Sequence, residues 1–303
     1  MFIISIKEIK TDIYLVQMIM TMSWYKKYLS IFEKPLDEVS PEIISFIQNN
    51  IKAKQSDTPL ASVILIAHNE ETRILSCLWS LSENKCNFPI EIICVNNNST
   101  DRTEEVIKLS GAKFLNETKK GPGYARQCGL NHAKGKYHLC IDADTLYPPY
   151  YIQTMVEALR KDNVACAYGL WSFMPDKTHS SIGLFFYEAL RDLHLRIQNI
   201  KRPELCVRGM VFAFNTEYGR KVGFRTDIIR GEDGSLALGL KDYGKLKFIT
   251  SRKARAMTCN STLSADGSLF NSFKVRLIKA LKGFGGLFSK KSDYQDNDSN
   301  LIK

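Results

Sequence analysis

Two aspartates that stand two positions apart are the residues of this chain best suited to hold a metal ion. Asp142 and Asp144 follow the apolar run 137–141, which predicts a buried strand. Because side chains alternate along a strand, both carboxylates should point to one side and Ala143 to the other. Such oxygens suit Mg²⁺ or Mn²⁺, which bind through one or two carboxylates and the phosphates of a substrate. An ordinary acidic turn is the alternative.

A second polar group follows the apolar run 62–67. Ala67, His68, Asn69 and Glu70 stand at its carboxyl end. Ligands of open α/β sheets bind outside the carboxyl ends of strands, so these residues are predicted to contact a base or ribose. The alternative is that Asn69 caps the next helix and the acids complement the helix dipole.

The next apolar run, 91–95, also ends in polar residues. Asn96 and Asn97 follow it, and their amides both donate and accept hydrogen bonds, as the edge of a nucleobase requires. Thr100 or Asp101 is a natural cap for the helix that comes next. The two roles are compatible.

A glycine-rich segment with cations offers a place for a diphosphate. Gly121, Gly123 and Arg126 stand near a predicted helix start, after Lys119 and Lys120. Glycine allows close approach of the backbone, and a helix N-terminus attracts anions. The spacing matches neither of the two common phosphate-binding fingerprints, so a glycine turn with surface lysines is an equal alternative.

A later acidic pair could supply a general base. Glu232 and Asp233 open an amphipathic segment that begins after Gly231. A carboxylate near a metal and a cationic loop could accept a proton from a substrate hydroxyl. By itself, the pair more often caps a helix.

The segments that position these residues alternate between strands and helices. This alternation predicts an α/β fold with a mostly parallel, Rossmann-like sheet flanked by helices. The expected strands lie near 62–67, 91–95, 112–115, 137–141, 210–214 and 246–249, and the expected helices near 70–82, 102–110, 123–134 and 233–243, with one more around Leu190 and Leu193.

Composition excludes several classes of protein. The 303 residues are 44% hydrophobic and 24% charged, which is ordinary for a folded chain and excludes a wholly disordered or collagen-like one. Eight cysteines without a CxxC pair, and five isolated histidines, make a zinc site improbable. The net charge of +10 favours anionic partners, yet no nucleic-acid-binding signature accompanies it, so we expect no nucleic acid partner.

The motifs together resemble the family 2 glycosyltransferases, inverting enzymes of the GT-A fold that use nucleotide-activated sugars. The matching pieces, in order, are 62–71, 96–103, 121–129 and Asp142-Ala143-Asp144, followed by 209–214 and 231–233. The family often has an aromatic residue in place of His68, and acids in place of Asn96 and Asn97. The glutamine, arginine and tryptophan cluster of processive polymerases is absent after residue 250, which favours a single addition of one sugar.

The resemblance implies a hexosyltransferase-type mechanism with inversion. Asp144, assisted by Asp142, would hold a divalent cation against the donor diphosphate, and Asp233 would take the proton of an acceptor hydroxyl, with Glu232 as the second choice. The acceptor would be a glycan or a lipid-linked sugar of the cell surface. The residues predicted to bind the donor are Ala67, His68, Asn69, Glu70, Asn96, Asn97, Gly123, Arg126, Asp142 and Ala143.

Two other functions compete with this interpretation. A phosphatase of the haloacid dehalogenase type also begins with two spaced aspartates, but Leu146 stands where that motif needs threonine or valine. A non-catalytic protein that binds a nucleotide sugar is the other alternative, with Asp233 acting only as a cap.

The expected organisation has three parts. A helical extension occupies 1–58, the GT-A catalytic domain 59–252, divided at 170 into donor and acceptor halves, and a C-terminal segment 253–303. No membrane-spanning run or secretion signal is evident, so a cytoplasmic location is expected. Residues 268–291 resemble a basic amphipathic helix, which predicts peripheral contact with the inner face of the cell membrane, or else packing on the domain.

Overall fold

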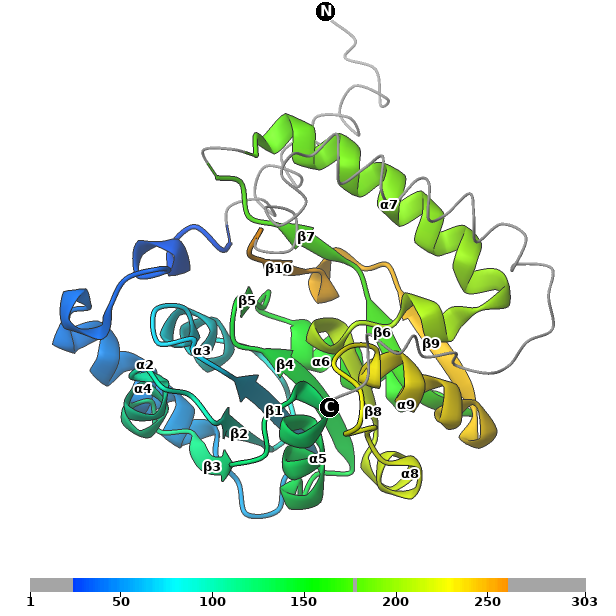
Figure 1. Cartoon of the computed structure of the whole chain (residues 1–303), viewed down its shortest axis with the longest axis horizontal. Coiled ribbons are helices and arrows are strands. Elements are labelled where there is room, and N and C mark those ends of the chain that lie inside the picture. The colour runs from blue at the N-terminus through cyan, green and yellow to red at the C-terminus, as the bar shows by residue number, and fades with distance from the viewer. Residues whose placement is uncertain (1–23, 177–178, 261–303) are drawn as a thin grey trace, which may run out of the picture.

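The protein is built on a seven-stranded mixed sheet with helices on both faces (Figure 1). The computed structural model describes residues 24–176 and 179–260. The strands stand in the order β3-β2-β1-β4-β8-β6-β9, and only β8 runs antiparallel to its neighbours β4 and β6. These strands are β1 (Ala61–Ala67), β2 (Ile90–Asn97), β3 (Lys113–Glu117), β4 (Tyr137–Asp142), β6 (Val164–Gly169), β8 (Phe212–Asn215) and β9 (Lys245–Ile249).

Helices connect these strands and cover the sheet. The sequence expects most of them within a few residues of where they lie, because each carries an apolar face at helical spacing. They are α2 (Pro41–Lys54), α3 (Ile74–Ser82), α4 (Thr103–Leu109), α5 (Pro122–His132), α6 (Tyr151–Leu159), α7 (Ser181–Lys201), α8 (Thr216–Val222) and α9 (Glu232–Leu240).

Strand β1 shows why the sheet needs a layer of helices on each face. Its side chains alternate, so Val63 and Leu65 join the large core that contains residues of α2, α3 and α6, whereas Ile64 packs against Ala125 of α5. Because β1 is buried on both sides, its sequence is a continuous apolar run.

A second, three-stranded sheet continues the domain beyond the predicted boundary at residue 252. It joins β5 (Thr145–Leu146), β10 (Ala256–Thr258) and β7 (Trp171–Phe173) in the order β5-β10-β7. Strand β10 therefore pairs with strands on the other side of the predicted boundary. Strands of two or three residues carry no readable periodicity, so the boundary could not be placed from the pattern.

The predicted fold class is confirmed. The first four predicted strands correspond to β1, β2, β3 and β4, and the helix around Leu190 and Leu193 is α7. The expected N-terminal extension includes α2, whose Ile47 and Ile51 are fully buried in the main core. The amphipathic segment 268–291 lies outside the described residues.

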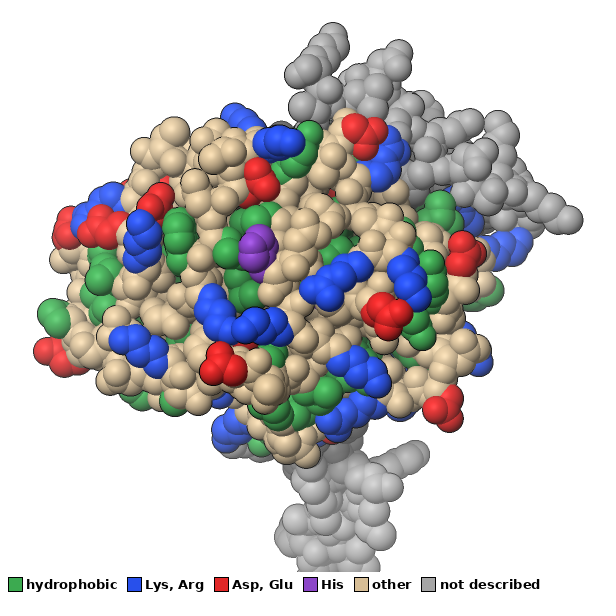
Figure 2. Space-filling view, turned by 90° about the horizontal axis from the view of Figure 1, so that it is seen from below, with side chains coloured by type: hydrophobic (Ala, Val, Ile, Leu, Met, Phe, Trp, Pro, Cys, Tyr) green, Lys and Arg blue, Asp and Glu red, His purple; other side chains and the backbone are tan. Residues whose placement is uncertain are grey.

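Lysine and arginine side chains are widely distributed over the surface of the described part, with acidic side chains among them. Figure 2, which looks at the molecule from below the view of Figure 1, shows lysine and arginine side chains spread over most of that face, with hydrophobic side chains in small groups between them. No helix among the described residues is both long enough and apolar enough to cross a bilayer.

Candidate active site

The sheet topology brings the predicted polar clusters to one edge. Strand β1 lies between β2 and β4, and all three run parallel. Ala67 pairs with Asn96 and Ile66 with Asp142, so the carboxyl ends of the three strands stand side by side. The groups that follow β1, β2 and β4 therefore meet at this edge, as the sequence predicts.

Three carboxylates gather at this edge without enough cations to neutralise them. Burial and the nearby charges of Asp144 and Asp142 raise the pKa of Glu70 to about 7, although Arg73, 3.2 Å from the Glu70 carboxylate, opposes the shift. Burial, followed by the charge of Asp142, also raises the pKa of Asp144. The edge therefore favours a bound cation.

Glu70 gives this crowding a measurable consequence. An acid whose folded-state pKa exceeds its unfolded value of 4.5 loses stabilising energy as pH rises from 4.5 to about 7, and the full cost remains above 7. We expect Glu70→Gln to gain up to about 3 kcal/mol relative to the native chain between pH 4.5 and pH 8, measured by urea unfolding in EDTA. The control is Glu157→Gln, an exposed residue on α6, whose free energy of unfolding should differ from that of the native chain by the same amount at both pH values. If Glu70→Gln also shows the same difference at both pH values, the crowding of the carboxylates is contradicted.

Arg126 connects Asp142, the first residue of the predicted metal motif, with the acidic pair Glu232 and Asp233. Its guanidinium is almost completely buried and lies 2.8 Å from Asp142, 3.3 Å from Glu232 and 2.9 Å from Asp233. A buried arginine that pairs with three acids is held from three directions, and removing it would leave the three carboxylates without compensation. The sequence predicts Arg126 as a donor ligand; the structure gives it this positioning contact with the acids.

Asp233, which the sequence predicts as the general base, is a largely buried acid. Its pKa is raised to about 7, first by burial, and further by Glu232 and Asp142, while Arg126 and the backbone N–H of Gly209 oppose the shift. Gly209 is required here, since a Cβ at this position would lie 1.8 Å from the Arg126 guanidinium and 2.7 Å from the Asp233 carboxylate. A carboxylate with a pKa near neutrality can both accept and return a proton at physiological pH.

The loops after β1 and β2 are tied to each other. The Asn69 side chain accepts a hydrogen bond from the backbone N–H of Thr100 at 2.8 Å, and the His68 ring lies 2.7 Å from the carbonyl of Asn97. Asn69 has a positive φ of 55°, and helix α3 begins at Ile74 without a side-chain cap. The alternative in which Asn69 caps the next helix is therefore wrong.

Asn96 and Asn97 are both buried, which changes what they can contact. The Asn97 amide donates to the carbonyls of Glu117 and Lys119 and accepts from the N–H of Gly121. These three hydrogen bonds of the Asn97 side chain hold the loop before α5. Asn96 donates to the side chain of Asn116 at 2.9 Å, which leaves its own carbonyl oxygen as the unpartnered group.

Gly123 is needed for packing. A Cβ at this position would lie 2.0 Å from the backbone carbonyl of Arg225, so the start of α5 touches the chain after α8. This contact concerns the side-chain direction of Gly123, so the expectation that its backbone approaches a diphosphate stays a prediction. Gly121, at φ 140°, provides the turn before the helix.

Two groups at the edge were not predicted from the sequence. Cys259, at the end of β10, lies with its sulfur 3.0 Å from Asp144 Oδ2, and Thr145 Oγ1 donates to Asp144 Oδ1 at 3.0 Å. Cys259 is 115 residues from Asp144, so no spacing rule could join them. The short pairing of β10 with β5 places them together.

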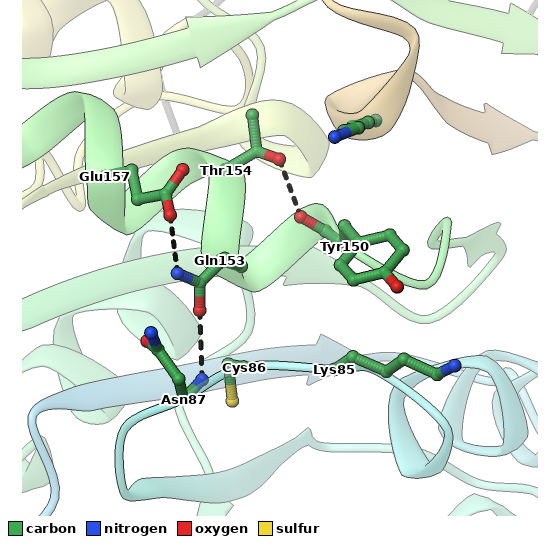
Figure 3. Close-up of a pocket in the computed structure, with 8 residues that line it drawn as sticks. Lys85, Cys86, Asn87, Tyr150, Gln153, Thr154 and Glu157 are labelled. Atoms are coloured by element: carbon green, nitrogen blue, oxygen red, sulfur yellow. Dashed lines mark hydrogen bonds between the residues drawn. The ribbon is translucent and has the colours of Figure 1, made fainter.

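A pocket of about 420 Å³ lies elsewhere, at the start of α6 (Figure 3). In Figure 3 the Gln153 side chain bridges the backbone N–H of Asn87 and the carboxylate of Glu157. None of the predicted site residues lines this pocket, so it is separate from the carboxylate edge. Its lining residues are Lys85, Cys86, Asn87, Tyr150, Gln153, Thr154, Glu157 and Lys253.

The carboxylate oxygens at the edge are suitable ligands for a hard divalent cation. Asp142 and Asp144 offer oxygen ligands, and the pKa of Asp144 is raised first by burial and then by the charge of Asp142, which a cation would offset. Among the described residues, no three histidine, cysteine, aspartate or glutamate side chains form a metal-binding group. A cation here would need further ligands from phosphate oxygens or water, as is usual for Mg²⁺.

The mostly parallel sheet with acidic residues at its carboxyl edge agrees with the GT-A fold expected from the sequence. The sequence agrees, since residues 62–216 match the model of glycosyl transferase family 2. The chain belongs to that family. Membership of this family favours neither the phosphatase nor the purely binding alternative.

Known proteins with similar sequences or folds extend this comparison. EpsH of Bacillus subtilis, named as a glycosyltransferase, is 34% identical over 119 residues, which cover 37% of this chain and 34% of EpsH. The Escherichia coli UDP-Glc:alpha-D-GlcNAc-diphosphoundecaprenol beta-1,3-glucosyltransferase WfgD is 24% identical over 133 residues, 43% of this chain and 51% of WfgD. The chain thus matches about a third to a half of these relatives.

Among solved structures, the mannosyltransferase PcManGT of Pyrobaculum calidifontis is similar in fold. The comparison covers 78% of this chain and 64% of PcManGT, with a TM-score of 0.50 and 20% sequence identity. At that identity the similarity concerns the fold alone.

Proposed function

We propose that this glycosyltransferase moves one sugar from a nucleotide diphosphate donor to an acceptor hydroxyl, with inversion and with the help of a divalent cation. The observation that carries the proposal is the buried link through Arg126, which joins the metal-motif Asp142 to the candidate base Asp233. Donor activation and acceptor deprotonation thereby share one rigid frame. The acceptor is a glycan or a lipid-linked sugar of the cell surface.

The donor side is the carboxylate edge. Asp144, assisted by Asp142, is the place for Mn²⁺ or Mg²⁺, and the cation would offset the charge that develops on the leaving diphosphate. The residues after β1 and β2 face the nucleoside; His68 is exposed there, next to the Asn97 carbonyl. UDP-Glc, the nucleotide sugar in the name of WfgD, agrees with such a donor.

The acceptor side is the start of α9. Asp233 accepts the proton of the acceptor hydroxyl while that oxygen forms its bond to the anomeric carbon and the bond to the diphosphate oxygen breaks. Attack from the face opposite the leaving group inverts the anomeric centre. Arg126 and Gly209 keep the Asp233 carboxylate in place during this step. Glu232, also paired to Arg126, is the second choice for the base.

A donor screen tests the proposal. We expect slow hydrolysis of one or a few nucleotide sugars by the purified chain, stimulated by Mn²⁺ or Mg²⁺ and abolished by EDTA, together with a raised melting temperature when the correct donor and metal are both present. The measurements are nucleoside diphosphate release and thermal unfolding. If the full panel of donors neither is hydrolysed nor changes the melting temperature, the proposed donor class is wrong.

A further inference from the structure

Helix α7 presents a long apolar stripe to the outside. Seven of the eleven large hydrophobic side chains exposed in the described part of the chain lie on this one helix, between Ile182 and Ile200, each 48% to 78% exposed. At 100° per residue they span an arc of roughly 140°. This stripe, called the α7 stripe below, is broader than the seam of a two-stranded coiled coil.

The opposite face of α7 is already packed on the protein. Leu184, Tyr187 and Leu195 are buried, and the Glu188 carboxylate accepts hydrogen bonds from Ser172 Oγ and from the backbone N–H of Phe173, both at 2.7 Å. The inner face of α7 is thus fixed to β7. The apolar residues of its outer face are not needed for this packing. A helix that is apolar on both sides needs a second partner.

The charges of α7 indicate what that partner is. Both acids of the helix, Glu188 and Asp192, turn toward the protein and pair with Arg255 at 3.2 and 2.7 Å. The charged residues that α7 exposes are basic, namely Arg196 and Lys201. A second copy of α7 would bring Arg196 no acid from the helix to pair with, whereas the headgroups of anionic phospholipids supply phosphates.

Positive charge alone does not distinguish α7 from the rest of the surface as a site for membrane binding. Figure 2 shows basic side chains over the face seen from below, where hydrophobic side chains occur only in small groups. In Figure 1, α7 lies beyond β7 and β10 as an outer layer of the described molecule. The combination of a broad apolar stripe and basic residues is found on α7, and it is the combination that lets a helix lie in the surface of a bilayer.

We infer that the α7 stripe is a docking surface for an anionic lipid bilayer, in which the helix lies parallel to the membrane. The small sheet connects this surface to the reaction centre: β7 pairs with β10, β10 pairs with β5, and β5 follows Asp144 directly. Docking through α7 therefore links the membrane surface, through the small sheet, to the carboxylate edge at Asp144. This inference needs no particular donor or acceptor.

Vesicle flotation of the full chain tests it. The native chain should float with vesicles of phosphatidylcholine and phosphatidylglycerol, and much less with phosphatidylcholine alone. Phe186→Asp combined with Leu193→Asp should weaken the binding by about a hundredfold or more, because two exposed apolar side chains no longer enter the bilayer. Arg196→Glu should weaken it several-fold at low salt and have less effect at high salt.

Matched controls distinguish α7 from the rest of the surface. Phe46→Asp replaces an aromatic side chain that is 45% exposed on α2, and Lys247→Glu reverses an exposed cation on β9; both should bind vesicles like the native chain. Unchanged flotation of the α7 variants would overturn the inference and assign binding to another segment, such as 268–291.

Failure of the full native chain to float would overturn it as well. Light scattering then tests the other occupant: a dimer that Phe186→Asp dissociates assigns the stripe to a second copy, and a monomer excludes that copy. Flotation requires no turnover, so its result is independent of the donor screen.

Discussion

Replacing Asp144 by asparagine should lower the rate of metal-dependent sugar transfer by about a thousandfold or more, because several kcal/mol of charge stabilisation at the leaving diphosphate depend on the cation that this carboxylate is proposed to hold. The measurement is kcat/KM for the donor found by screening, at saturating Mn²⁺. The variant should stay folded, since burial and the charge of Asp142 already raise the Asp144 pKa and penalise its ionised form.

The matched control is Asp162→Asn, which removes an exposed carboxylate in the turn between α6 and β6. It should keep the native rate and the native dependence on Mn²⁺. Isothermal titration in the presence of donor should show the metal affinity of Asp144→Asn reduced together with its rate. Full turnover by Asp144→Asn would remove the proposed metal role, and loss of the fold would be recognised by urea unfolding.

The fold could be predicted where the sequence of a strand is a clear apolar run. Strands β1, β2 and β4 are apolar runs that end in polar residues, and their parallel pairing follows from the helices between them. Strand β6 was missed, because Val164–Gly169 has the sequence VACAYG, in which small residues weaken the strand signal. Its burial comes from contacts with β8 and β9, which lie far away in the sequence.

The site could be predicted at the level of the sheet edge but not at the level of contacts. Topology alone brings the ends of β1, β2 and β4 together, so the meeting of their polar residues follows from the strand order. The pairing of Arg126 with Glu232 joins residues 106 positions apart, and a sequence pattern has no means to record it. Gly123 shows the converse: its residue type was informative, but its partner is the Arg225 backbone.

Asp233→Asn should stop transfer while leaving the donor bound. Asparagine keeps the size of the side chain but cannot accept the proton of the acceptor hydroxyl, so kcat should fall by about a hundredfold to ten-thousandfold. The dissociation constant of the donor with its metal, measured by titration calorimetry, should stay close to the native value. If donor affinity and kcat fall together, Asp233 supports the structure through Arg126 and is not the base.

The pH profile separates the base from a merely structural acid. Because burial raises the Asp233 pKa to about 7, the ionised form that accepts a proton predominates only above that pH. The native kcat should therefore fall about tenfold per unit below pH 7 and level off above it. Glu232→Gln should keep this acidic limb if Asp233 is the base, whereas the residual rate of Asp233→Asn should lack it. Glu70, whose pKa is also about 7, is separated in the same way, since Glu70→Gln should retain the limb.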